Sequence, residues 1–411
     1  MTTPAAPRLR HDSTGGARIR LQTAGYYAAF IALGLVSASL GPTLPGLAKN
    51  TGSPLSHISL LFAARSSGYL AGSLLGGRLY DRMAGHPVMS GSLLVMAATM
   101  STAPLLAHLA VLAGVIFALG MAEGALDVGG NTLLVWLHRE AVGPVMNGLH
   151  FCFGLGAFLS PLIVAWAMPE DGAVVRAYWT LALLQLPAAV WLLRLASPSD
   201  RATGGAISSQ PVNGRLVALI VLFFFLYAGA EVAFGGWIYS YAVALRLSSP
   251  AVAAYLTSAF WGALTIGRLL AVPLALRFPP RSILLADCVG CLAGLAVLLL
   301  GSHSLVATFV GTCGAGVSMA SIFPAALSLA QGRMRITGRV TGWFFVGASG
   351  GGMTLPWLIG QFFDAAGPRA VVVILLIDMT AAMTVLAVLT FRSARPAYRW
   401  LTGDSGRPQK N

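Results

Sequence analysis

Charged residues are scarce in this chain of 411 residues: only 9% are Asp, Glu, Lys or Arg, against roughly 25% in an ordinary soluble domain. Hydrophobic residues make up 56% of the sequence, and the mean hydropathy is +0.77. A water-soluble fold of this composition would lack the polar side chains that its surface needs. The composition therefore excludes a soluble domain and favours a protein embedded in a membrane.

Cysteines and catalytic motifs are also few. Four cysteines in 411 residues do not form a disulfide framework. Cys288 and Cys291 form a CxxC, but the surrounding run is apolar, so we interpret them as inert helix cysteines. The sequence has no phosphate-binding glycine loop followed by Lys-Ser or Lys-Thr, no HExxH and no nucleophile elbow. We therefore expect no enzyme activity, no cofactor and no metal site.

Long apolar runs fill most of the chain. Crossing the hydrocarbon layer of roughly 30 Å takes about 20 apolar residues per helix. Twelve such runs lie at residues 21–45, 56–79, 87–106, 109–137, 144–168, 174–195, 215–245, 251–276, 282–301, 304–330, 339–363 and 368–391. The first run is too long for a typical signal-peptide core, so we expect it to be a retained helix.

The net charge of +13 is distributed unevenly along the chain. Basic residues recur on alternate loops, with twenty on the side of the two termini and four on the other side. This asymmetry is typical of the positive-inside rule, which places both termini in the cytoplasm and the protein in the inner (plasma) membrane. The basic charge therefore indicates membrane topology and not nucleic-acid binding.

A polar linker rich in Gly, Ser and Pro separates the sixth run from the seventh. It divides the chain into a cytoplasmic arm (1–20), a six-helix bundle (21–195), the linker (196–214), a second six-helix bundle (215–391) and a cytoplasmic tail (392–411). The predicted fold class is an all-α membrane protein with twelve transmembrane helices in two pseudo-symmetric six-helix bundles.

An internal repeat supports this division. A shift of roughly 190 to 195 residues superposes features of one half on the other, as parallel repeats of a transporter require. The matched pairs are Gly34 and Gly229, Gly41 and Gly236, Gly77 and Gly267, and Gly156 and Gly351.

The segment at residues 77–86, GRLYDRMAGH, follows the second run. It resembles the loop 2–3 signature of the major facilitator superfamily, G-x-L-x-D-R-x-G-R-[KR]. It departs from the signature by one extra residue before Gly85 and by His86 in place of a basic residue. In that family the Asp and Arg lock the inward-closed interface between the bundles, so the resemblance implies a gating role for Asp81 and Arg82.

Three further segments narrow the resemblance: residues 122–131, residues 147–157 and residues 260–268. They look like the sodium-dependent glucose transporter-like branch, which is related to the fucose permeases. The glucose branch implies transport of a sugar with sodium, and the fucose permeases imply transport of a sugar with protons. The resemblance to the superfamily covers the whole chain.

Acidic residues inside the apolar runs are candidates for binding a coupling cation. Ionisable side chains cost about 2.5–3.5 kcal/mol at membrane depth on insertion scales, so those that remain usually face a cavity or a partner. Glu123, Asp127 and Asn131 are spaced by four, which puts all three on one helix face. Two acids one turn apart repel, so one must be protonated or share a cation, or must pair with a buried arginine. Glu231, among glycines in the seventh run, is the second candidate coupling residue.

Polar and aromatic side chains in the runs are candidates for substrate binding. Sugars have apolar faces and hydroxyls, and both kinds of surface need partners. The predicted substrate-binding residues are Asn131, Asn147, His150, Trp237, Tyr241, Trp261, Trp357 and Gln361. For the aromatic residues of the seventh run, an interfacial belt position is the alternative interpretation.

Two arginines lie within apolar runs and are predicted to have gating or structural roles. Arg65 is interpreted as a counter-ion to Glu123 or Asp378, or as a ligand for an anionic substrate. Arg268 and Asp287 are interpreted as a structural ion pair.

The resulting functional hypothesis is a secondary active transporter that moves a small polar solute, a sugar, by cation-coupled symport with alternating access. The coupling cation is a proton or sodium. Its expected partners are the small-molecule substrate and the lipid bilayer, and we expect a monomer. A proton-coupled efflux antiporter of drugs is the alternative, although the fifth run lacks the glycine series G-P-x-x-G-G of drug antiporters. A non-transporting receptor or scaffold is a third hypothesis.

Overall fold

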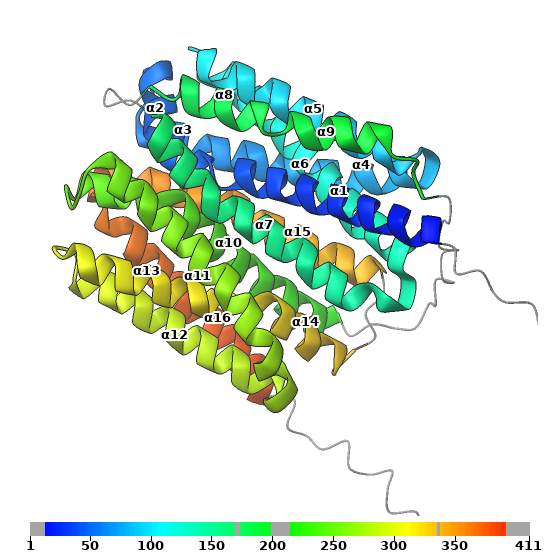
Figure 1. Cartoon of the computed structure of the whole chain (residues 1–411). Helices are drawn as coiled ribbons and strands as arrows, with labels where there is room; N and C mark the ends of the chain where they lie inside the picture. Colours follow the sequence, from blue (N-terminus) through cyan, green and yellow to red (C-terminus); the bar gives the residue numbers. More distant parts are fainter. Residues whose placement is uncertain (1–12, 169–172, 199–213, 335–337, 392–411) are drawn as a thin grey trace, which may run out of the picture.

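The computed structural model describes residues 13–168, 173–198, 214–334 and 338–391, which are helical with no strand in these ranges. The first half contains α1 (Ser13–Ser37), α2 (Leu40–Thr51), α3 (Leu55–Ile58), α4 (Leu60–Arg82), α5 (Gly85–Thr102), α6 (Leu109–His138), α7 (Val142–Ala167), α8 (Val175–Leu183) and α9 (Leu186–Arg194). The second half contains α10 (Gly214–Ala244), α11 (Pro250–Arg277), α12 (Pro280–Leu300), α13 (Leu305–Met319), α14 (Ile322–Gln331), α15 (Gly338–Ala366) and α16 (Arg369–Phe391). Figure 1 shows the two sets of helices side by side.

These helices form twelve membrane spans. Nine stretches of the described chain are helical, long and apolar enough to cross a bilayer, and one of them, Leu109–Ala167, contains both α6 and α7. The α8–α9 pair and the glycine-rich α15 supply the remaining two. The prediction of twelve transmembrane helices in two six-helix bundles is confirmed.

Several spans are broken helices, which the apolar runs did not predict. The span of α1 and α2 is interrupted between Ser37 and Leu40, just before the Gly41-Pro42 pair. A proline follows the break between α8 and α9, and another follows the break between α13 and α14. Proline lacks the N–H that continues a helical hydrogen-bond ladder, which favours breaks at or before it.

The predicted repeat is visible in the packing of the two bundles. A Cβ on Gly34 of α1 would overlap the main chain of Phe153 on α7. At the equivalent place, Gly229 of α10 lies against the main chain of Gly351 on α15. Glycines allow main chains to approach this closely because they carry no side chain. Gly156 meets the main chain of Ile31 as Gly351 meets that of Phe225, so these two glycine pairs match because each bundle uses the same helix contact.

The closest packing in the first bundle joins α4 to α6. Gly68 and Gly72 of α4 meet the main chain at Phe117 and Met121, and a Cβ at either glycine would overlap it. On the facing helix, Gly120 and Gly124 meet the main chain of α4 at Arg65 and Tyr69. This interlocking of small residues at intervals of four brings the polar faces of α4 and α6 together.

The predicted domain boundaries remain predictions, since residues 1–12, 199–213 and 392–411 lie outside the described chain. The described start of the linker is fixed to the first bundle. His86 of α5 is fully buried; its Nδ1 lies 2.9 Å from the Leu195 carbonyl oxygen and its Nε2 lies 2.8 Å from the Tyr26 hydroxyl. Gln22 donates to the Ala196 carbonyl over 2.7 Å.

We predict that Gly72→Val destabilises the protein, because a side chain there must push α4 away from α6. Overpacking of this kind costs about 1–3 kcal/mol or more. The apparent melting temperature in detergent should fall by roughly 5 °C. Gly77→Val on the same helix is the matched control, since within the described chain no atom beyond its own stretch of helix lies within 4 Å of the position of its Cβ. Equal melting temperatures for the two variants would contradict this account of the packing.

Candidate functional site

A cavity of about 1120 Å³ lies between the two bundles. Its walls come from α1, α4, α6 and α7 on one side and from α10, α11, α14 and α15 on the other. It extends from Gly41 and Gly236 down to Phe278 and Pro280, at the turn between α11 and α12. That turn lies at the end of the molecule where α1 begins (Figure 1). Most of the lining is apolar, with a few polar groups concentrated on facing walls.

The first bundle contributes an ion pair. Arg65 Nε donates to Glu123 Oε2 over 2.7 Å, and Arg65 Nη2 donates to Glu123 Oε1 over 2.6 Å. The Ser37 hydroxyl also donates to Glu123, and Arg65 Nη1 donates to the Ser37 carbonyl at the end of α1. The interpretation of Arg65 as counter-ion to Glu123 is confirmed. Asp378 is buried on α16, and among the described residues its Oδ2 has no hydrogen-bond partner.

Asp127 lies one turn further along α6 and differs from Glu123 in its partners. The Tyr69 hydroxyl donates to Asp127 Oδ2 over 2.6 Å, and the Asn131 side chain donates to Asp127 Oδ1 over 3.1 Å. Both partners are neutral, and within the described chain no arginine or lysine pairs with this carboxylate. Asp127 is therefore an uncompensated acid on the cavity wall.

Sequence reasoning missed Tyr69 as part of the site. Arg65 and Tyr69 are four residues apart on α4, as Glu123 and Asp127 are on α6. Arg65 is therefore as far along the chain from Glu123 as Tyr69 is from Asp127, 58 residues in each case. A stripe of polar residues at intervals of four on the second run was the signal that would have found it.

The second bundle contributes a looser charged pair. Arg268 Nη2 of α11 lies 3.8 Å from Glu231 Oε1 of α10, and the Tyr227 hydroxyl donates to Glu231 Oε2. The predicted pair of Arg268 with Asp287 is wrong. Asp287 instead accepts a hydrogen bond of 2.6 Å from Ser321, because the break between α13 and α14 brings that hydroxyl to α12.

Four of the predicted substrate-binding residues do line the cavity: Asn131, Asn147, His150 and Trp261. His150 lies edge-on to the ring of Phe30, with ring centroids 6.1 Å apart. Trp261 packs edge-on against Phe153 across the interface, and its Nε1 finds no acceptor in the part of the chain that the structure describes. Asn131, Asn147 and His150 belong to the first bundle and Trp261 to the second, so both bundles contribute to this part of the lining.

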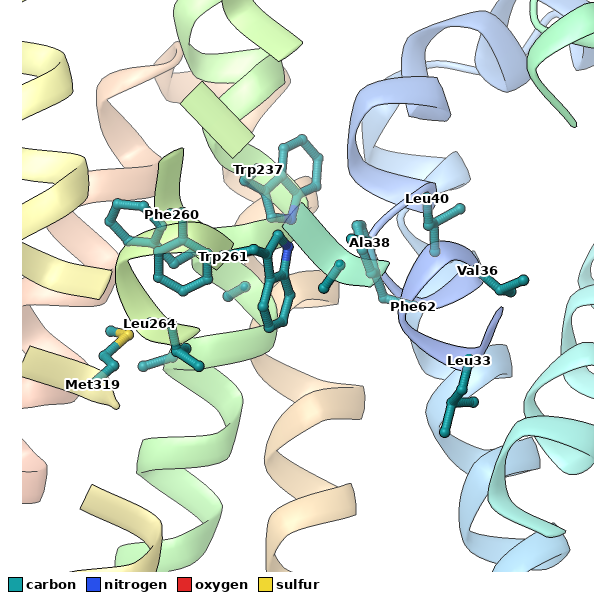
Figure 2. Close-up of a cluster of buried hydrophobic side chains, with 14 of the residues drawn as sticks. Leu33, Val36, Ala38, Leu40, Phe62, Trp237, Phe260, Trp261, Leu264 and Met319 are labelled. Carbon is teal, nitrogen blue, oxygen red and sulfur yellow. The ribbon is translucent and has the colours of Figure 1, made fainter. Parts of the chain in front are cut away.

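The prediction that Trp237 and Tyr241 face a sugar is not supported, because neither lines the cavity. Trp237 donates to the Pro356 carbonyl over 2.9 Å and packs against Phe62 and Phe363. Figure 2 shows Trp237 directed toward the first bundle beyond Trp261, beside Ala38 and Phe62. Tyr241 is buried in the second bundle and donates to the Leu298 carbonyl over 3.0 Å. The flanking Gly235 and Gly236 reach the cavity instead, since successive residues on a helix point in different directions.

Trp357 and Gln361 also lie outside the cavity, at its closed end. Gln361 Nε2 donates to the Ser56 carbonyl over 2.7 Å, and the neighbouring Asp364 Oδ2 accepts from the Ser56 amide over 2.8 Å. The Ser59 hydroxyl donates to the Trp357 carbonyl over 3.4 Å. These contacts join α3 and the start of α4 to α15. We call the contacts of Ser56 with Gln361 and Asp364 the outer latch.

The signature residues Asp81 and Arg82 are exposed at the other end of α4. Among the described residues neither forms an ion pair or a hydrogen bond through its side chain. The lock that the resemblance implies for them is therefore open in this conformation, in which the cavity reaches the same end of the molecule. Their gating role stays a prediction.

Two six-helix repeats around a central cavity with charged groups on both walls define a membrane transporter of the alternating-access class. The model of the Major Facilitator Superfamily matches residues 26–356, and the chain belongs to this family. It is 33% identical to sodium-dependent glucose transporter 1 of Xenopus laevis over 353 residues, covering 79% of this chain and 72% of that protein. It is 28% identical to human major facilitator superfamily domain-containing protein 4A, covering 90% and 91% of the two chains.

Solved structures show the same fold. A variant of the nucleoside transporter NupG aligns with a TM-score of 0.74 at 12% identity, covering 90% of this chain and 98% of that one. A variant of the fucose:proton symporter FucP of E. coli aligns with a TM-score of 0.61 at 18% identity, covering 92% and 99%. At these identities the likeness establishes the fold, and the chemistry must come from the site.

We predict that Glu123→Gln destabilises the protein far more than Asp127→Asn. The first change leaves the Arg65 guanidinium without its counter-ion, which costs about 3–5 kcal/mol in buried pairs. The second change removes the charge of Asp127, which has no arginine or lysine partner among the described residues, so no buried cation loses its counter-ion. Melting curves in detergent should separate the variants, and the double variant Arg65→Met with Glu123→Met should recover much of the loss. A similar melting temperature for both single variants would contradict the assignment of the ion pair.

We predict that breaking the outer latch opens the closed end of the cavity. The variants Asp364→Ala and Gln361→Ala each remove a hydrogen bond that the Ser56 main chain makes with α15. The test is labelling of Ala38→Cys, in a background without native cysteines, by an impermeant thiol reagent added on the α3 side of sealed vesicles. Ala38, labelled in Figure 2, is 4% exposed and lines the cavity near its closed end. Labelling should accelerate several-fold in both latch variants, and unchanged rates would show that the latch does not hold this end shut.

Proposed function

We propose that the chain is a cation-coupled symporter of a neutral sugar, in which Asp127 binds the coupling cation. The observation that carries the proposal is the charge balance of the cavity wall. Among the described lining residues, the arginines are Arg65 and Arg268, and the carboxylates are Glu123, Asp127 and Glu231. Each arginine lies beside a glutamate, so the excess is one negative charge, at Asp127.

One bound cation would make the cavity neutral. A proton or a sodium ion at Asp127 removes the uncompensated charge, whose burial in a closed carrier is costly in a low-dielectric setting. Tyr69 and Asn131 hold the carboxylate in place in either case. Binding of the cation then favours the conformations in which the bundles close over the site, since a ligand shifts an equilibrium toward the state it binds better.

The substrate follows from the lining and from the relatives. The Asn131 and Asn147 amides and the His150 ring offer donors and acceptors for hydroxyls, and Trp261 offers a flat apolar face. The names of the curated relatives include glucose transport, and that of one structural neighbour includes fucose and proton symport. These facts together support a sugar as the solute.

The orientation follows from charge. The side with the two termini carries twenty basic residues and the opposite side four, so we place the termini in the cytoplasm and the chain in the plasma membrane. In this orientation the cavity faces inward and the outer latch closes the outside. We expect a single chain to be the transporting unit, since one chain contains both repeats.

An efflux antiporter of cationic amphipathic molecules is the second candidate. The largely apolar lining and the single excess negative charge would also suit a cation that competes with a proton at Asp127. In that case a cationic dye, and no sugar, would exchange with protons.

We predict that Asp127→Asn exchanges a sugar but no longer concentrates it. Wild type and variant are compared in proteoliposomes with labelled D-glucose, L-fucose and D-xylose, with proton and sodium gradients imposed separately. Wild type should accumulate at least one sugar under one gradient and carry one positive charge per sugar. Asp127→Asn should retain counterflow and lose accumulation by about 10-fold or more. Asp127→Glu, which preserves the charge, is the matched control.

Two results would contradict the proposal. If Asp127→Asn still accumulates sugar against its gradient, then Asp127 does not bind the coupling cation. If wild type moves none of the sugars and instead exports a cationic dye under a proton gradient, then the antiporter hypothesis replaces the symporter.

A further inference from the structure

The two arginine–glutamate pairs of the cavity differ in how completely their hydrogen-bonding groups are used. Arg65 makes two short bonds with Glu123 and a third with the Ser37 carbonyl. Arg268 and Glu231 are 3.8 Å apart at their nearest atoms, beyond hydrogen-bond distance. In the described chain the Arg268 side chain makes no hydrogen bond at all.

Glu231 is also only half satisfied. The Tyr227 hydroxyl donates to its Oε2, while Oε1 faces Arg268 without a hydrogen bond. The side chains of Arg268 and Glu231 are 30% and 17% exposed, against 16% and 1% for Arg65 and Glu123. The second pair therefore presents several free N–H donors and one free carboxylate acceptor, side by side, to the cavity.

We propose that Arg268 and Glu231 bind two neighbouring hydroxyls of the substrate, one accepting from the guanidinium and the other donating to the carboxylate. This proposal rests on the sugar transport proposed above. It adds the functional group of the sugar that is recognised, a vicinal diol. A hydroxyl both donates and accepts, so an adjacent pair can satisfy a donor and an acceptor that do not satisfy each other. Charged partners make such bonds stronger than neutral ones do.

Charge argues for a neutral diol over an acidic sugar. Arg268 and Glu231 are neutral as a unit, and carboxylates already exceed arginines by one among the described lining residues. A substrate carboxylate at Arg268 would displace Glu231 as its counter-ion and leave a second uncompensated acid. A diol inserts without changing this balance.

The same balance separates the diol site from the cation site. The positive charge of Arg268 lies beside Glu231, so Glu231 needs no transported cation for compensation, whereas Asp127 on the facing bundle does. A diol held by α10 and α11, with Asn131 and Asn147 on the opposite wall, would touch both bundles at once. Substrate binding would then connect the two halves that must close together.

The experiment is competition against labelled D-glucose by the full series of monodeoxy-D-glucoses and by D-glucuronate. Counterflow in proteoliposomes and equilibrium binding in detergent are both measured for wild type, Arg268→Gln, Glu231→Gln and the control Arg277→Gln. Arg277 lies on the same helix but outside the cavity lining. Melting curves confirm that each variant is folded.

In wild type, two of the monodeoxy analogues, each lacking one hydroxyl of the bound adjacent pair, should compete about 10-fold more weakly than D-glucose. Each of them leaves one charged side chain without its hydroxyl partner. In Arg268→Gln the affinity for D-glucose should fall by about 10-fold, while the analogue without the hydroxyl that Arg268 binds should compete nearly as well as D-glucose does. In Glu231→Gln the other of the two analogues should compete nearly as well as D-glucose does, and Arg277→Gln should behave like wild type.

Two results would overturn the diol site while leaving sugar symport intact: an equal loss of affinity for every analogue in Arg268→Gln, or stronger competition by D-glucuronate than by D-glucose in wild type. If wild type neither binds nor moves D-glucose, both proposals are contradicted for this sugar: the diol site does not bind it, and the chain does not transport it.

Discussion

The close contact between α4 and α6 determines where the charged groups on the first bundle's cavity wall lie. Gly72 and Gly124 bring the two main chains together, so that side chains one turn apart on α4 meet side chains one turn apart on α6. Arg65 consequently meets Glu123, and Tyr69 meets Asp127. Without small residues at this contact the helices would stand further apart, and a buried carboxylate would face neither a guanidinium nor a phenol. A packing constraint therefore sets the electrostatics of the site.

The break between α1 and α2 also affects the electrostatics of the site. A helix leaves its last carbonyls without intrahelical partners, which is tolerated at membrane depth only where the main chain borders a cavity or a protein donor. Here the Ser37 carbonyl accepts from Arg65, and the Ser37 hydroxyl donates to Glu123. The interrupted backbone thus completes the hydrogen bonding of the ion pair. Asp127, one turn further along α6, accepts only from the neutral side chains of Tyr69 and Asn131 among the described residues.

Most of the fold could be predicted from apolar runs and the glycine repeat, because both report directly on membrane depth and on helix contacts. The polar stripe at Glu123, Asp127 and Asn131 was also readable, since spacing by four defines a helix face. Spacing could not show which face of α10 meets the cavity, and so Trp237 was misplaced: packing against Phe62 and Phe363 decides its direction. Nor could spacing reveal that Arg268 lies beside Glu231 and not Asp287, since that choice depends on how α10, α11 and α12 are arranged.

The closed end must be strong enough to hold and weak enough to open. Apart from the Asp364 carboxylate, the polar contacts that join the two bundles there are neutral: Gln361 to the Ser56 carbonyl and Ser59 to the Trp357 carbonyl. A neutral hydrogen bond contributes about 0.5–1.5 kcal/mol net. Reversing a two-state equilibrium from 1:99 to 99:1 takes about 5.5 kcal/mol of differential binding. The polar contacts at this end are thus of the size that binding of one cation and one solute can offset, whereas a buried ion pair across the interface would have held it shut.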